Sequence, residues 1–337
     1  MTDTRRGTGA RRPMPGQRAA ALMLASLTWA LAPGPAAAEY PERLIRLVVP
    51  QAPGSATDVL ARILAAETER QIGQSIVVEN RPGGALTTGL SFTAKSAPDG
   101  YTIAMGPVGA LAITRHLVKK LPYDIERDFQ PIALVTRGQM LLAVSPKLPV
   151  RSVQELVALA KAKPGTLVYA SSSAGSPGHV GGELFKFMTG TDIAHVPYRG
   201  GSMAITDLMS GQVHMMLESL SSIAPFAQSG DVRALAVSGP RRSPAFPNLP
   251  TIDEAGVPGF EVTTWNGVIG PAGMPRSVVD KLNAAINRAV HTPAFGERLG
   301  ALGQEVAGGT PEDFARTIQR DSAKWLDVIR RSGLKPD

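Results

Sequence analysis

Two segments of the sequence place small and hydroxyl-bearing residues between an apolar run and a helical pattern. The first, PQAPGSATDVLARILAAETERQIG (50–73), passes from a strand-like run through a short loop to a helix that starts near Thr57 or Asp58. Backbone N–H groups in the first turn of a helix lack an intrahelical acceptor, and the helix dipole favours negative charge there. The segment therefore predicts either an anion-binding loop or an ordinary capped turn. The candidate contact residues are Gly54, Ser55, Ala56, Thr57 and Asp58.

The second segment, VYASSSAGSPGHVGGELFKFMTG (168–190), repeats this order of strand-like run, small-residue loop and helix. Its loop holds eight consecutive small or proline residues, which is more than a turn requires. Two such loops that face each other across a cleft would clamp a carboxylate from both sides. The candidate contact residues are Ser172, Ser173, Ala174, Gly175, Ser176 and His179.

Asp58 and His179 open the two predicted helices, and each has two interpretations. Asp58 either compensates the helix dipole or contacts a donor group of a ligand, such as an amine or a hydroxyl. His179 either packs against and caps its helix or contacts the ligand directly. The sequence alone leaves both alternatives open.

Motifs of catalysis and of metal binding are missing from the sequence. It contains no G-x-S-x-G, no phosphate-binding G-x-x-x-x-G-K-[ST], no G-x-G-x-x-G and no H-E-x-x-H. The five histidines are scattered, and the absence of cysteine excludes disulfides and thiolate metal sites. We therefore expect a protein that is not an enzyme and has neither a metal nor a cofactor. A Ser-His-acid triad is recognised by geometry rather than by motif, so the motifs alone leave a serine hydrolase open.

Short apolar runs alternate with helical patterns from residue 44 onward. The strand-like runs span 44–50, 75–80, 101–107, 141–146, 167–172, 194–198, 213–218 and 232–239. The helical patterns span 57–72, 152–163, 179–189, 202–210 and 221–229, and 276–332 is mostly helical. This alternation is typical of α/β folds with parallel sheets covered on both faces. The pattern restarts after residue 141 without a flexible linker, which predicts two domains joined by crossing strands.

The N-terminal segment 1–38 has the three parts of a secretory signal peptide. Residues 1–18 are basic, residues 19–32 are apolar, and PGPAAA ends in an A-x-A site at Ala38. The apolar run is shorter than the ~20 residues of a transmembrane helix, and no later run reaches that length. We expect export to the periplasm with cleavage after Ala38. Because the basic region is long, Met14 is an alternative start.

The formal net charge of +7 depends strongly on that segment. Residues 1–38 carry five arginines against Asp3 alone, so the remainder has 30 basic and 27 acidic residues, a net charge of +3. The small excess is spread along the chain and has no basic run with interleaved aromatic residues. A nucleic-acid partner is therefore not expected.

The mature chain resembles a known family, the Bug-type or TctC-type solute-binding proteins of tripartite tricarboxylate transporters. The resemblance covers about 40–334 and is carried by short segments in a fixed order. They include YPERLIRLVVP, DVLARILA, IVVENRPGG, APDGYTIAMG, LPYDIERDFQPIALV, LPVRSVQELVALAKAKPG, HVGGELFKFMTG, HVPYRGG, TDLMSGQVHMM, VRALAVSGPRRSPAFPNLPTIDEAGVPGFEVTTWNG and PAGMP.

The resemblance implies a type II periplasmic-binding-protein fold with two lobes, each with a central, mostly parallel sheet, and a ligand cleft between them. Lobe 1 would comprise 39–141 and 259–337, and lobe 2 would comprise 142–258. Members of the family hold a carboxylate between the two strand–loop–helix elements described above. The resemblance adds further lining residues, namely Pro107, Val108, Tyr198, Gly201, Ser202, Glu218 and Trp265. Trp265 is either an apolar wall beside the ligand, which we favour, or a core aromatic residue.

The resemblance also implies a function. A monomer would capture a small carboxylate (a di- or tricarboxylate, an amino acid or an aromatic acid) by closure of its lobes. It would then deliver the ligand to membrane permease subunits. The alternatives are an exported ligand sensor for a membrane kinase and an exported hydrolase or isomerase acting on small acids.

Overall fold

The computed structural model describes residues 1, 2, 7, 9 and 40–334, so the predicted signal peptide and its cleavage site lie outside the described residues. The described residues from Arg43 onward form one compact unit. In the described part of the chain, no helix combines the length and the apolar character that crossing a membrane requires.

The first lobe is built on a sheet in which β1 pairs in parallel with β2 and β3. β9 pairs antiparallel with β3 and with β4, and β10 pairs antiparallel with β4. The strands of this lobe are β1 (Ile45–Val49), β2 (Ile76–Asn80), β3 (Thr102–Pro107), β9 (Thr263–Pro271) and β10 (Gln304–Val306). We propose that its helices are α2 (Ala56–Ile72), η2 (Gly84–Leu86), α3 (Thr87–Ala94), η3 (Gly109–Ile113), α4 (Thr114–Leu117), α9 (Arg276–Val290), α10 (Pro293–Ala301) and α11 (Pro311–Ser332).

The second lobe repeats the parallel arrangement, because β5 pairs in parallel with β6 and β7. β7 and β8 both pair antiparallel with β4. The strands of this lobe are β5 (Val168–Ser171), β6 (Ala194–Pro197), β7 (Met215–Ser219) and β8 (Arg233–Val237). Its helices are α5 (Val153–Ala162), α6 (Pro177–Thr189), α7 (Gly201–Ser210) and α8 (Leu220–Gln228).

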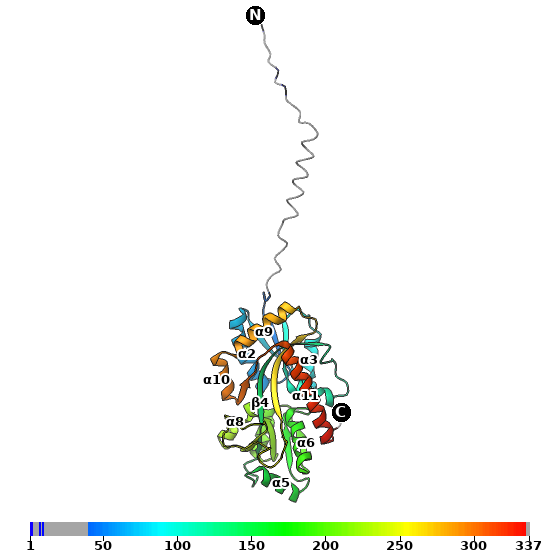
Figure 1. Cartoon of the computed structure of the whole chain (residues 1–337), viewed down its shortest axis with the longest axis vertical. Coiled ribbons are helices and arrows are strands. Elements are labelled where there is room, and N and C mark those ends of the chain that lie inside the picture. Colours follow the sequence, from blue (N-terminus) through cyan, green and yellow to red (C-terminus); the bar gives the residue numbers. More distant parts are fainter. Residues whose placement is uncertain (3–6, 8, 10–39, 335–337) are drawn as a thin grey trace. The chain divides into compact units, whose positions relative to one another are not determined.

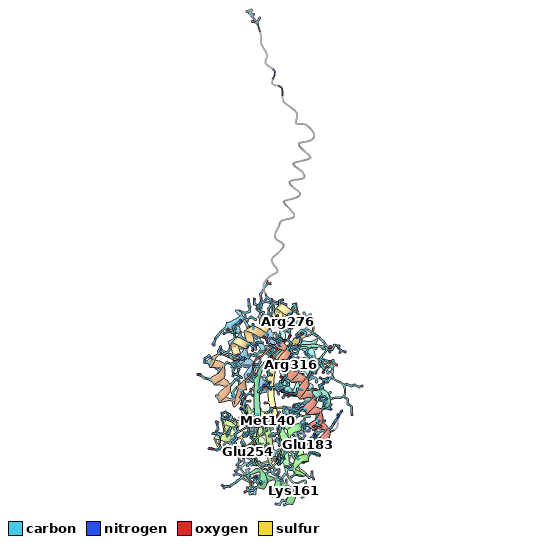
Figure 2. The ribbon with its side chains drawn as sticks, in the orientation of Figure 1. Met140, Lys161, Glu183, Glu254, Arg276 and Arg316 are labelled. Atoms are coloured by element: carbon cyan, nitrogen blue, oxygen red, sulfur yellow. The ribbon has the colours of Figure 1, made fainter. Side chains whose placement is uncertain are left out.

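Strand β4 (Phe129–Val144) belongs to both lobes. Its pairing with β9 ends at Gln139, and its pairing with β7 begins at Met140, which is labelled in Figure 2. In Figure 1, α2, α9 and α10 lie around one half of this strand, and α5, α6 and α8 lie around the other. We propose that the division between the lobes falls at this change of partners, close to the predicted boundary after residue 141.

The predicted α/β fold with two lobes is confirmed, and its sheet is mixed. The pairs among β1, β2 and β3 and among β5, β6 and β7 are parallel, and every antiparallel pair involves β4 or β9. Buried apolar side chains from both lobes, such as Val48, Leu142 and Leu217, belong to one continuous cluster. This shared core holds the ends of the parallel strands, where the candidate loops lie.

Candidate functional site

The two small-residue loops are called loop 1 (residues 50–55, between β1 and α2) and loop 2 (residues 172–176, between β5 and α6). They have the same backbone hydrogen bonds. In loop 1, the Ser55 amide donates to the Ala52 carbonyl at 3.2 Å, and the matching bond in loop 2 joins Ser176 to Ser173 at 3.2 Å. Gly54 and Gly175 adopt φ angles of +78° and +73°, which favour glycine. Each loop is therefore a tight turn that ends on the cap of a helix.

The helix caps of the two loops also match. The Ser55 hydroxyl accepts the Asp58 amide at 3.2 Å, and the Ser176 hydroxyl accepts the His179 amide at 3.2 Å. Serine is a preferred N-cap, because its oxygen satisfies one of the first-turn amides. The side chain of the third helical residue then accepts the glycine amide of the turn in both loops. Two segments far apart in the sequence thus build the same frame at the start of α2 and of α6.

Asp58 completes the frame of loop 1. Its carboxylate accepts the Gly54 amide at 2.9 Å, the Asn80 amide at 2.9 Å and two bonds from the Arg62 guanidinium. Burial raises the pKa of this carboxyl, but the hydrogen bonds from Arg62, Gly54 and Asn80 outweigh burial, so that the pKa lies below its usual value. The structure therefore gives Asp58 a full set of protein partners.

His179 completes the frame of loop 2. Its Nδ1 accepts the Gly175 amide at 3.1 Å, and its ring stacks on His195 with 4.1 Å between ring centroids and 9° between ring planes. The His195 ring stacks in turn on Tyr169 at 4.6 Å. Loop 2 is thus backed by a column of three aromatic rings.

The start of α2 is tied to the end of β3 through Asn266. The Thr57 hydroxyl donates to Asn266 Oδ1 at 3.2 Å, and both side chains are buried. Asn266 on β9 lies opposite Pro107 on β3, and the buried Val108 follows as the cap of η3. These contacts bring predicted residues of loop 1 and of the β3 end together.

The end of β3 also meets loop 2. A Cβ atom on Gly109 would lie 3.4 Å from Leu86 Cδ1, 3.5 Å from Pro177 Cδ and 3.8 Å from the Gly175 carbonyl oxygen. Leu86 has a φ of +75°, a strained conformation for a residue with a side chain. Sequence reasoning did not single out Leu86, and no local signal marks it.

The starts of α6 and α7 both lie against the end of β7. Gly178 of α6 lies so close to the Leu217 carbonyl oxygen that a Cβ atom there would fall well inside van der Waals contact. A Cβ atom on Gly201 of α7 would lie 3.4 Å from the Glu218 carboxylate. The N-cap of α7 is Gly200, whose lack of a side chain leaves the helix without a side-chain cap. These close approaches connect the end of β3, loop 2 and the end of β7, and so bring together the regions of Pro107, Pro177, Gly201 and Glu218.

Glu218 is a buried carboxyl at the end of β7, with 6% of its surface exposed. Burial raises its pKa to about 7, and the bond that Oε1 accepts from the Ser219 amide at 2.9 Å offsets part of that rise. The group is therefore largely protonated below neutral pH. As a neutral acid it can donate a hydrogen bond, and as a carboxylate it accepts one.

The raised pKa of Glu218 predicts how stability depends on pH. The folded pKa of about 7 exceeds the unfolded value of 4.5. The contribution of Glu218 to the free energy of unfolding is therefore fully present below about pH 4.5 and is lost as pH rises toward 7. Replacing Glu218→Gln removes this loss, so the variant should gain up to about 3 kcal/mol over the wild type across that window. Urea denaturation of both proteins at several pH values measures the gap. If the free energy of unfolding depended on pH in the same way in both proteins, the raised pKa of Glu218 would be contradicted.

The remaining predicted residues lie at the surface of this region. Ser172 and Ser173 are half-buried, and Ala174 and Ser202 are exposed. The Tyr198 hydroxyl donates to Asp207 Oδ2 at 2.6 Å, and burial raises the pKa of the phenol to about 12, with the Asp207 carboxylate adding to the rise. Tyr198 therefore stays protonated, with its hydroxyl directed to α7.

Trp265 lies on the other face of β9 from Asn266. Its indole N–H donates to Asp321 Oδ2 at 2.6 Å, its ring packs edge-on against Phe314, and 1% of its surface is exposed. Successive side chains of a strand point to opposite faces, so the contact of Asn266 with Thr57 fixes Trp265 on the α11 side. The structure thus does not bring Trp265 to the loops, and it brings Asn266 there instead. The TTWNG motif contained a signal for this, because Trp265 and Asn266 are consecutive in a strand and cannot both face the loops.

A cavity of about 530 Å³ is lined in part by residues of β4 and β9. None of the predicted contact residues lines it. Among the described residues, no group of three or more His, Cys, Asp or Glu side chains is arranged to hold a metal ion.

The fold and the loops define a class of protein. This is an α/β chain with two lobes, a strand (β4) shared between them, and helix N-termini gathered at the carboxyl ends of the parallel strands. These features define a two-lobed solute-binding protein. The sequence profile described as "Tripartite tricarboxylate transporter family receptor" (TctC) matches residues 60–334. The chain belongs to this family, and the predicted resemblance is confirmed.

Similar proteins agree with this assignment. BugT of Bordetella pertussis is 36% identical over 297 residues, which cover 88% of this chain and 91% of BugT. The structure of R. palustris Rpa4515 with adipate has 38% identity and a TM-score of 0.85, and covers 89% of this chain and 100% of the other. MatC from Rhodopseudomonas palustris with bound malate has 33% identity and a TM-score of 0.81, and covers 86% of this chain and 100% of the other. The family and its solved members are solute-binding receptors, so the protein is a binding protein and not an enzyme.

Proposed function

We propose that the protein captures a small carboxylate between its two lobes and delivers it to the membrane permease of a tripartite tricarboxylate-type transporter. The observation that carries this proposal is the matched pair of loops, each of which leads into a helix N-terminus. The adipate and malate in the structures of two relatives support a carboxylate as the ligand class.

The donors in the proposed site are backbone amides. In α2, the amides of Ala56 and Thr57 occupy the first turn, while that of Asp58 is used by Ser55. In α6 the first position is Pro177, which has no N–H, so only Gly178, the counterpart of Thr57, supplies a first-turn donor. The helix dipoles add to these donors, since an anion is stabilised at a helix N-terminus. The carboxylate would therefore be held chiefly by α2, with α6 facing it.

Glu218 narrows the proposed ligand class. A buried carboxyl that is neutral at slightly acidic pH tolerates an anion and donates a hydrogen bond to it. A ligand with a second polar group, such as a dicarboxylate or a hydroxy acid, would use both the α2 amides and this side chain. The matching chemistry is that of a short diacid or of an acid bearing a hydroxyl or an amine.

The cellular setting is part of the proposal. We propose that residues 1–38 direct export to the periplasm, with cleavage after Ala38, and that the mature protein acts as a monomer. Lobe closure around the ligand would create the surface that the permease recognises.

The test is calorimetric titration of the purified protein with a panel of acids. The panel contains adipate, malate, other di- and tricarboxylates, amino acids and aromatic acids, with matched amides as neutral controls. We expect one equivalent of at least one acid to bind, no binding of its amide, and no product after long incubation. Binding of the amides as tightly as the acids would refute the carboxylate proposal.

A further inference from the structure

The two loops share one hydrogen-bond frame but differ in the side chain that closes it. The Gly54 amide donates to a carboxylate oxygen of Asp58, whereas the Gly175 amide donates to Nδ1 of His179. All other bonds of the frame match in type and nearly in length. The two frames therefore differ in one respect, the acceptor of the glycine amide, which is a carboxylate oxygen in loop 1 and an imidazole nitrogen in loop 2.

The two acceptors respond differently to acid. A carboxylate with a lowered pKa, such as that of Asp58, accepts a hydrogen bond throughout the neutral and mildly acidic range. Imidazole Nδ1 accepts only while the ring is neutral and carries its proton on Nε2. Protonation turns Nδ1 into a donor that faces the Gly175 N–H, so the closing bond of loop 2 is lost.

The ring that stacks on His179 stays neutral, because the pKa of His195 is strongly lowered. Burial lowers the pKa of the stacked His195 to about 3, and His179 and Lys186 add to that effect. The Lys186 ammonium is held by Glu183, which also accepts the Tyr169 hydroxyl at 2.7 Å; Glu183 is labelled in Figure 2. His195 thus stays neutral, with its Nε2 2.8 Å from the Ser171 hydroxyl.

Among the described residues of lobe 1, Leu117 and Thr114 lie closest to Gly175. A Cβ atom on Gly175 would lie 3.6 Å from Leu117 and 3.8 Å from Thr114. On the same short helix, Arg115 pairs with Glu126, and His116 bonds to Ser322. At the end of β7, burial raises the pKa of Glu218 to about 7.

We propose that His179 is a positioning residue that fixes loop 2 through Gly175, so that loop 2 keeps its binding geometry only while the His179 ring is neutral. This inference rests on the proposed function for its effect on affinity, but not for its effect on the loop. Binding of a carboxylate should accordingly weaken as pH falls through the range in which imidazole titrates.

The sign of the pH effect separates this role from two others. If the His179 ring contacted the ligand directly, its positive charge would strengthen the binding of an anion at low pH. Protonation of Glu218 would also strengthen it, because a negative charge near the ligand is removed. Weakening at low pH that His179→Asn removes is expected only when protonation of His179 opens the loop, because protonation of the ligand itself would weaken binding in both proteins.

The first experiment follows the loops without any ligand. Amide NMR of the protein expressed from the full chain, between about pH 8 and about pH 5, reports Gly54 and Gly175 separately. We expect the Gly175 amide to shift and to exchange faster as His179 titrates, while Gly54 is unaffected, and His179→Asn to abolish the Gly175 change. Asn retains an oxygen acceptor that does not titrate, as Asp58 does in loop 1. A Gly175 amide that is insensitive to pH in the wild type would overturn the proposal.

The second experiment measures affinity with adipate and malate as probes. It uses the Glu218→Gln background, which removes the opposing titration. We expect affinity to fall about fivefold between about pH 8 and about pH 5.5, corresponding to one hydrogen bond, and to change less than about twofold when His179→Asn is added. A rise in affinity at low pH that His179→Asn removes would assign His179 to direct contact and overturn positioning. If no acid of the panel binds the wild-type protein at any pH, the proposed function fails, and the NMR result alone decides the inference.

Discussion

Replacing Ala56→Pro should weaken carboxylate binding by about thirtyfold and leave the fold intact. Ala56 is the first residue of α2, and its amide is one of the two first-turn donors that we assign to the ligand. A hydrogen bond to a charged group contributes about 1.5–3 kcal/mol, which corresponds to the expected loss of affinity. Proline is favoured at this helix position, because its missing N–H has no intrahelical acceptor.

The backbone of the preceding residue already suits proline. Ser55 has φ −69° and ψ 160°, which is the extended conformation that a following proline requires. Loop 2 contains the same substitution naturally, since Pro177 follows Ser176 with φ −71° and ψ 159°. Thermal unfolding should therefore show little change for Ala56→Pro, and calorimetry with the acid identified in the panel should show the loss.

The matched control is the reverse change, Pro177→Ala in α6. It restores a first-turn amide to the second loop, so affinity should be equal to or tighter than that of the wild type. The pair of variants thus changes one N–H in opposite directions on two copies of the same frame. Equal affinity for Ala56→Pro and wild type would remove α2 from the proposed site.

The fold was largely predictable because most elements carry a local signal. The strand-like runs 44–50 and 75–80 and the helical pattern 57–72 differ from the observed elements by a residue or two. β4 was predicted only from residue 141, whereas it begins at Phe129. Its first part contains Pro131 and polar residues, and it forms a strand because β9 and β10 pair with it on both sides. Such pairing is a tertiary effect that no local pattern reveals.

The candidate site was predictable as a pair of loops but not as a set of roles. The sequence shows Asp58 four residues before Arg62, a spacing that favours an ion pair, yet the Asn80 contact comes from a distant strand. Which of two interpretations applies to Asp58 therefore depended on residues that folding brings together. Trp265 posed the same problem, because the side of β9 that faces the loops is set by the register of the sheet.

Replacing Gly178→Ala should abolish tight binding and destabilise the protein by about 2 kcal/mol. A methyl group at this position would overlap the Leu217 carbonyl oxygen, which is main chain of a central strand and has no flexible end to move. Overpacking of this kind typically costs about 1–3 kcal/mol. Relief requires the start of α6 to move off β7, and that movement carries the Gly178 amide and loop 2 away from the ligand.

Gly296→Ala in α10 is the matched control, since a Cβ atom there meets nothing within 4 Å and alanine stabilises helices. Urea denaturation and calorimetry of both variants separate the two cases, and a Gly178→Ala protein that binds as tightly as Gly296→Ala would show that α6 does not need its close approach to β7 for capture.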